Sequence, residues 1–160
     1  MAKKKSATTL AMRALDEKGI EYEPLPQARK QFTAEGVAAD LNVPVAWVVK
    51  AMIVQSSSHG FALFVVPGDR HLSLKAAGAA LGDKNVMLAA QRDVERVTGY
   101  QVGAVSVLGY RRDDVPSYVD EGVLALERVV ISSGRPDMGL ALDPDDLVRA
   151  LQATVGEYAY

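Results

Sequence analysis

Residues 47–54 read Trp-Val-Val-Lys-Ala-Met-Ile-Val, and this stretch decides the fold. A continuous apolar run of this length, rich in β-branched residues, predicts a buried strand. A second run, Phe-Ala-Leu-Phe-Val-Val at residues 61–66, follows a serine-rich turn and predicts the neighbouring strand. Helical patterns precede and follow this pair, so the chain is predicted to be an α/β domain with a mixed sheet.

The predicted helices begin at residues that cap helices well. Thr8, Thr33 and Ser73 can each accept a hydrogen bond from the first turn that follows. Asp143 with Pro144 gives the clearest start, since proline is favoured in the first helical position. A further helix is expected at residues 90–97. Shorter extended segments are expected at residues 20–25, 86–88, 127–132 and 139–142.

The composition is that of an ordinary globular protein, with 160 residues, 49% of them hydrophobic and 24% charged. This length predicts one domain over residues 1–160, with residues 1–7 as a flexible basic tail. Lys3 to Lys5 in that tail either touch phosphate or are simply solvated. No apolar run approaches the roughly 20 residues that span a bilayer, so we expect no membrane contact and a cytoplasmic location.

Several classes of site are excluded or disfavoured. The chain has no cysteine, which excludes disulfides, thiolate metal sites and a cysteine nucleophile. His59 and His71 stand in turn-like surroundings, so neither is expected to bind a metal. No cofactor is expected either. The net charge of −2 argues against DNA binding and against binding along an extended length of any nucleic acid. Asp120 and Glu121 are adjacent and would point apart on a strand, so they make a poor acid–base pair.

Lys50 is the first candidate functional residue, because it lies inside the most apolar predicted strand. An unpaired ammonium is costly to bury, so it must form an ion pair, reach water at an edge, or line a cavity. In a cavity its charge would suit a phosphate, a carboxylate or a developing oxyanion. The sequence alone leaves these alternatives open.

The second candidate is the loop Thr-Gly-Tyr-Gln-Val-Gly-Ala-Val-Ser at residues 98–106. Its two glycines allow tight turns and a close approach of the backbone to a ligand. The small residues that follow could offer N–H donors and a hydroxyl to a polar guest. The same spacing also fits a strand-to-strand turn that binds nothing.

Together these segments carry a resemblance that covers about residues 20–150. The chain is similar to the YbaK family of aminoacyl-tRNA deacylases, which includes the editing domain inserted in bacterial prolyl-tRNA synthetases. No single one of the matching motifs is specific to this family, but their occurrence in the same order and at the same spacing is. The matching motifs are Thr33-Ala34-Glu35, Val49-Lys50, Val66-Pro67-Gly68-Asp69, Leu72-Ser73-Leu74-Lys75, Thr98-Gly99-Tyr100-x-x-Gly103 and Ser132-Ser133-Gly134.

The resemblance implies a strongly twisted, mixed, partly barrel-like sheet surrounded by helices. It implies a metal-independent hydrolase that cleaves the ester between a wrong amino acid and the 3′-terminal adenosine of tRNA. The expected substrate is tRNA-Pro or a related tRNA carrying Cys, Ala or Ser, with a synthetase as an open second partner. Lys50 is the expected catalytic residue. The expected substrate-binding residues are Thr33, Gly103, Ala104, Val105, Ser106, Val107, Ser133 and Gly134.

Two points stay open. Val107 stands where the family pattern has proline. A valine at this position restores a backbone N–H and frees φ, so the amino-acid specificity of the site stays open. Thr33 is either a helix cap only or a wall of the pocket. The alternative function is a non-catalytic module that binds the aminoacyl-adenosine end of tRNA for a synthetase complex.

Overall fold

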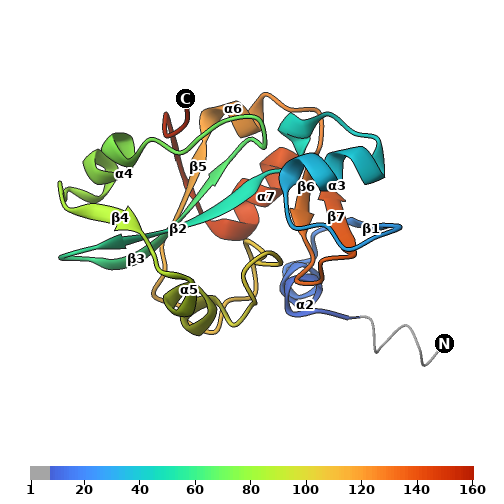
Figure 1. Cartoon of the computed structure of the whole chain (residues 1–160), viewed down its shortest axis with the longest axis horizontal. Coiled ribbons are helices and arrows are strands. Elements are labelled where there is room, and N and C mark those ends of the chain that lie inside the picture. The colour runs from blue at the N-terminus through green and yellow to red at the C-terminus, as the bar shows by residue number, and fades with distance from the viewer. Residues whose placement is uncertain (1–7) are drawn as a thin grey trace.

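The computed structural model describes residues 8–160, so the predicted basic tail at residues 1–7 lies outside the described residues. The mixed α/β class is confirmed (Figure 1). Within residues 8–160, none of the helices has the length and apolar character that a membrane span requires. The α-helices are α2 (Leu10–Glu17), α3 (Ala34–Leu41), α4 (Leu74–Leu81), α5 (Gln91–Thr98), α6 (Glu121–Leu124) and α7 (Pro144–Leu151). The strands are β1 (Glu23–Pro26), β2 (Lys50–Ser56), β3 (Gly60–Val66), β4 (Val86–Leu88), β5 (Ser117–Asp120), β6 (Val129–Ser132), β7 (Met138–Leu142) and β8 (Thr154–Gly156).

The strands form two sheets rather than one. A five-stranded sheet has the order β4-β2-β3-β5-β8, and a three-stranded sheet has the order β1-β7-β6. The larger sheet is mixed, because β4, β2 and β3 pair antiparallel while β3, β5 and β8 pair parallel. In Figure 1 the larger sheet occupies the left and centre of the molecule and the smaller sheet the right.

The two sheets are joined just before β2 begins. Val48 forms a parallel bridge with Val130 of β6, and the N–H of Val49 donates to the Val130 carbonyl at 3.1 Å. One apolar core fills the space between the sheets, and Leu15 of α2 and Leu147 of α7 are fully buried in it. The continuity between the sheets accounts for the partly closed, barrel-like arrangement that the resemblance implied.

Most predicted elements are confirmed, with shifted boundaries. The strand predicted at residues 47–54 is wrong at its start, because Val45–Trp47 form a 3₁₀ turn and β2 begins at Lys50. This turn packs over Gly68, where a side chain would collide with the carbonyls of Val45 and Val48. The first helix is capped by Thr9, whose hydroxyl accepts from the N–H of Met12 at 3.2 Å, and not by Thr8.

Strands β5 and β8 were not predicted, and both are short segments whose partners are distant in the chain. Asp120 ends β5 and is buried, with its carboxylate accepting from the N–H groups of Gly122, Tyr158 and Ala159 at 2.8–2.9 Å. This carboxylate therefore holds the C-terminal segment in place. The neighbouring Glu121 is exposed and begins α6, so the two acids do not share a strand as the sequence had suggested.

Candidate functional site

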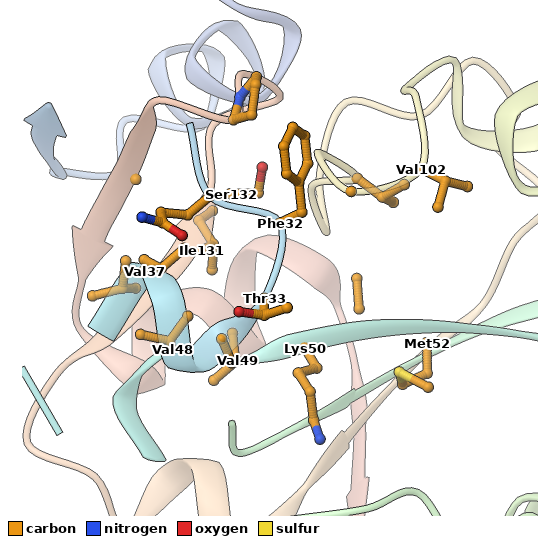
Figure 2. Close-up of a pocket in the computed structure, with 18 of the residues that line it drawn as sticks. Phe32, Thr33, Val37, Val48, Val49, Lys50, Met52, Val102, Ile131 and Ser132 are labelled. Carbon is orange, nitrogen blue, oxygen red and sulfur yellow. The ribbon is translucent and has the colours of Figure 1, made fainter. Parts of the chain in front are cut away.

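A cleft of about 590 Å³ opens where helix α3, strand β2, helix α5 and the edge of the smaller sheet meet. Figure 2 shows Thr33 between Phe32 and Lys50, with Val102 on one side and Ile131 and Ser132 on the other. Most of the lining is apolar. The polar and charged residues that line the cleft are Gln27, Gln31, Thr33, Glu35, Lys50, Gln91, Ser132 and Arg135.

Lys50 is the first residue of β2 and one of the residues that line the cleft. No ion pair or hydrogen bond of its ammonium is present within residues 8–160, so the structural ion pair is not found there. Its side chain is half-buried, and in Figure 2 it is directed away from Phe32 and Ser132. Lys50 therefore borders the cleft as a residue, and the hydrogen-bonding capacity of its ammonium is unused by the described chain.

Thr33 begins helix α3 and also borders the cleft, so its two predicted roles coexist. Its hydroxyl accepts from the N–H of Gly36 at 3.0 Å, which satisfies one free donor of the first turn. Phe32, immediately before it, is 62% exposed at the mouth of the cleft. Because the cap fixes the start of the helix, it also fixes where Phe32 and Thr33 border the opening.

The glycine loop lies directly against Phe32. Gly103 has φ +96°, and a Cβ there would lie 2.6 Å from Cδ1 of Phe32. Only glycine satisfies both the backbone conformation and the close contact. The N–H of Ala104 donates to the Gln101 carbonyl at 3.0 Å, whereas the N–H groups of Gly103 and Val105 have no hydrogen-bond partner within residues 8–160. Two residues that line the cleft therefore have N–H donors that the described chain leaves unused.

A pair of hydrogen bonds joins the glycine loop to the turn after β6. The hydroxyl of Ser106 donates to the Ser132 carbonyl at 2.5 Å, and the hydroxyl of Ser132 donates to the Ala104 carbonyl at 3.3 Å. The same Ser132 hydroxyl accepts from the N–H of Gly134 at 3.1 Å. Since Ser106 is fully buried, this connection belongs to the interior wall of the site rather than to its surface.

Tyr100 contacts both the glycine loop and the turn after β6, on the side of these two segments that faces away from the cleft. Its hydroxyl donates to the Leu108 carbonyl at 2.6 Å, and a Cβ on Gly134 would lie 2.5 Å from its ring. Gly134 has φ +99°, so glycine is required there for the same two reasons as at Gly103. The buried Ser133 hydroxyl donates to the Met138 carbonyl at 2.8 Å and closes the turn.

Four of the nine predicted site residues line the cleft, namely Thr33, Lys50, Gly103 and Val105. The other five lie behind it: Ala104, Ser106, Ser133 and Gly134 hold the two turns together, and Val107 packs in the main core with 4% of its surface exposed. The roles of all nine in substrate binding or catalysis remain predictions.

The sequence reasoning missed Phe32, Glu35, Val102, Ser132 and Arg135 as residues of the cleft. Phe32 and Val102 could have been found as large apolar residues next to turn signals, at positions that no core pattern required. Ser132 carried a weaker signal, as the first residue of a turn already singled out. Within residues 8–160, no group of three His, Asp or Glu residues is arranged to hold a metal ion.

The charges at the cleft are few. Glu35, Lys50 and Arg135 are the charged residues among its lining within the described chain. Arg135 forms two hydrogen bonds of 3.0 Å to Asp137, and this pairing lowers the pKa of the Asp137 carboxyl. Glu35 and Lys50 have no such partner, so one anion and one cation are left to meet a ligand.

A mixed α/β fold with an apolar cleft, a lysine beside it and a glycine loop with free donors defines a class of small-ligand site. The sequence profile of the aminoacyl-tRNA editing domain matches residues 28–150. The chain belongs to this family. A protein of Enterococcus faecalis, EbsC, is 30% identical over 99% of this chain and 96% of its own length, and its name describes a candidate Cys-tRNA(Pro)/Cys-tRNA(Cys) deacylase. The proline–tRNA ligase of Thermosipho africanus is 30% identical over 81% of this chain, which spans 22% of the ligase.

Solved structures show the same fold. The hypothetical protein APE2540 superposes with a TM-score of 0.88 at 27% identity, covering 94% of this chain and 99% of that one. A protein described as a candidate trans-editing enzyme for prolyl-tRNA synthetase superposes with a TM-score of 0.87 at 24% identity, covering 94% and 95%. The YbaK-type fold expected from the sequence is therefore confirmed.

Proposed function

We propose that this protein is a trans-editing deacylase that hydrolyses the ester of mischarged aminoacyl-tRNA. The favoured substrate is tRNA-Pro, or a related tRNA, carrying a small wrong amino acid such as Cys, Ala or Ser. The observation that carries the proposal is the cleft itself, in which an unpaired lysine and a loop with two unused N–H donors border one apolar opening. Family membership over residues 28–150 supports it independently.

The proposed reaction is direct hydrolysis. Water attacks the ester carbonyl carbon, and the carbonyl oxygen becomes a tetrahedral oxyanion. The N–H groups of Gly103 and Val105 are suited to stabilise this oxyanion, because donors fixed in advance need no reorganisation during the reaction. The bond between the carbonyl carbon and the ribose oxygen then breaks, the ribose oxygen takes the proton that the attacking water gives up, and the free amino acid leaves. Lys50 would stabilise developing charge or bind a phosphate of the acceptor end.

The partner in this proposal is the 3′ acceptor end of tRNA, contacted over a small area. The net charge of −2 does not suit a long electrostatic contact with the acceptor stem. A prolyl-tRNA synthetase is proposed as a second partner, since the matching region in the ligase is part of a much longer chain. Because charged tRNA is used in the cytoplasm, we place the protein there as part of the same proposal.

The alternative is a module that binds the aminoacyl-adenosine end without cleaving it. The valine at position 107 keeps this alternative open, since the family pattern has proline beside the ester. A deacylation assay separates the two functions. Purified protein is incubated with tRNA-Pro charged with Cys, Ala, Ser or Pro, and loss of the labelled aminoacyl group is followed against a protein-free control.

We expect release of at least one wrong amino acid to be accelerated at least tenfold over spontaneous hydrolysis, with Pro-tRNA-Pro spared. Retention of every ester, together with protection of one of them from spontaneous hydrolysis, would support the binding module instead.

A further inference from the structure

Glu35 is the one carboxylate that lines the cleft within residues 8–160. It lies on the first turn of α3, two residues after the capping Thr33. Its carboxylate forms no ion pair and no side-chain hydrogen bond with any other described residue. It is exposed at the opening, so its charge is available to a ligand that enters.

An acid in the first turn of a helix has an ordinary explanation, since it interacts favourably with the helix dipole. Helix α7 provides the comparison within the same chain. Asp145 occupies the first turn of α7, which also has eight residues and a side-chain cap. Asp145 does not line the cleft, whereas Glu35 does. The dipole therefore explains an acid at both positions, and only the cleft distinguishes Glu35.

The proposed substrate carries a positive group that could pair with Glu35. An aminoacyl ester carries a free α-ammonium one carbon away from the carbonyl that is attacked. Lys50 is positive, and Arg135 is already neutralised by Asp137. Without an anion, the α-ammonium would enter a cleft whose one unpaired charge has the same sign, and like charges at short range repel. Glu35 supplies the missing opposite charge.

We propose that Glu35 binds the α-ammonium group of the aminoacyl ester and so selects for a free amino acid on the tRNA. This inference rests on the proposed function, because it names the substrate group that one residue of the same cleft recognises. Glu35 is a binding residue in this account and takes no proton from the attacking water.

Binding of stable analogues tests the inference without relying on hydrolysis. The probes are 3′-(L-alanylamino)-3′-deoxyadenosine, which carries the α-ammonium, and 3′-propionylamino-3′-deoxyadenosine, which lacks it and is otherwise alike. Calorimetric titration is carried out with the wild type, Glu35→Gln and the matched control Asp145→Asn. We expect the wild type and Asp145→Asn to bind the alanyl probe at least tenfold more tightly than the propionyl probe, and Glu35→Gln to bind both equally.

A preference for the alanyl probe that survives in Glu35→Gln would overturn the inference, and so would equal binding of both probes by the wild type. Failure of the wild type to bind either probe would overturn the inference and count against the proposed function as well. A third outcome is that Glu35→Gln loses the preference for the alanyl probe while the wild type hydrolyses no ester. That outcome would support the inference about Glu35 and would favour the binding module over the deacylase as the function. Thermal melting of the two variants serves as the folding control, since both lose a first-turn acid.

Discussion

The hydroxyl of Ser106 donates a 2.5 Å hydrogen bond to the carbonyl oxygen of Ser132, which lies 26 residues further along the chain. The return bond, from the Ser132 hydroxyl to the Ala104 carbonyl, makes the connection reciprocal. Two turns that the sequence presents separately are thereby fixed as one wall of the cleft. The position of the glycine loop relative to β6 thus depends on side chains as well as on the backbone.

Replacing Ser106 with alanine should loosen this wall. The Ser132 carbonyl loses a buried donor, which costs about 1–3 kcal/mol of unfolding free energy. We expect Ser106→Ala to remain folded, to melt at a lower temperature, and to deacylate more slowly. Ser57→Ala is the matched control, because the Ser57 hydroxyl bonds Asp83 outside the cleft. Equal activity of the two variants would show that the connection between the turns is not needed for the reaction.

Gly103 should not tolerate a side chain. In Gly103→Ala the residue must keep φ +96° while its Cβ meets the Phe32 ring at 2.6 Å, so either the loop or the ring must move. Gly19→Ala provides the control, because Gly19 has φ +68° and nothing within 4 Å of a Cβ. Both changes should cost on the order of 1–3 kcal/mol from backbone strain, measured by urea unfolding. We expect only Gly103→Ala to lose deacylation, and equal activities would contradict that.

Val107→Pro tests the departure from the family pattern. Val107 lies in a loop, and its N–H makes no backbone hydrogen bond within residues 8–160, so proline removes none. The protein should therefore stay folded. The change should reorder which aminoacyl group is removed fastest, because discrimination among small side chains is worth only about 1–3 kcal/mol. An unchanged ranking would mean that position 107 acts as core packing alone, consistent with its 4% exposure.

Alkaline pH should destabilise the support under the two turns. Burial raises the pKa of Tyr100 to about 12 from its ordinary value of 10, and burial also raises the pKa of Tyr110. The folded state therefore holds these protons more tightly than the unfolded state. Their contribution to stability is complete below pH 10 and is lost as pH rises toward 12. Urea unfolding should show this decline, and Tyr100→Phe should make it shallower; an unchanged slope would contradict the assignment.

Sequence patterns correctly predicted the features of the fold that depend on residues close together in the chain. Thr33 and Asp143 were predicted as caps and are caps, because capping is decided within one helical turn. The start of β2 was misplaced, because the turn before it is set by contact with Gly68, which lies far along the chain.

The candidate site divides in the same way. Lys50 was visible from the sequence because a charge inside an apolar run requires a reason. Phe32 and Ser132 were missed, because each borders the cleft through contacts with residues of the glycine loop that lie 71 and 28 positions away, and no local pattern encodes such contacts. Glu35 was hidden for another reason, since a first-turn acid is ordinary in a helix and only the cleft marks it as different.

The most direct test of the central claim compares the single-turnover deacylation rate of the wild type with that of Lys50→Ala on mischarged tRNA-Pro. Lys75→Ala is the matched control, because Lys75 lies on α4 and does not line this cleft. We predict that Lys50→Ala loses at least tenfold, equivalent to about 1.4 kcal/mol of barrier, with an unchanged or higher melting temperature because an unpaired ammonium is removed. Lys75→Ala should match the wild type. Full activity of Lys50→Ala together with a marked fall in melting temperature would contradict the account and assign Lys50 to the fold.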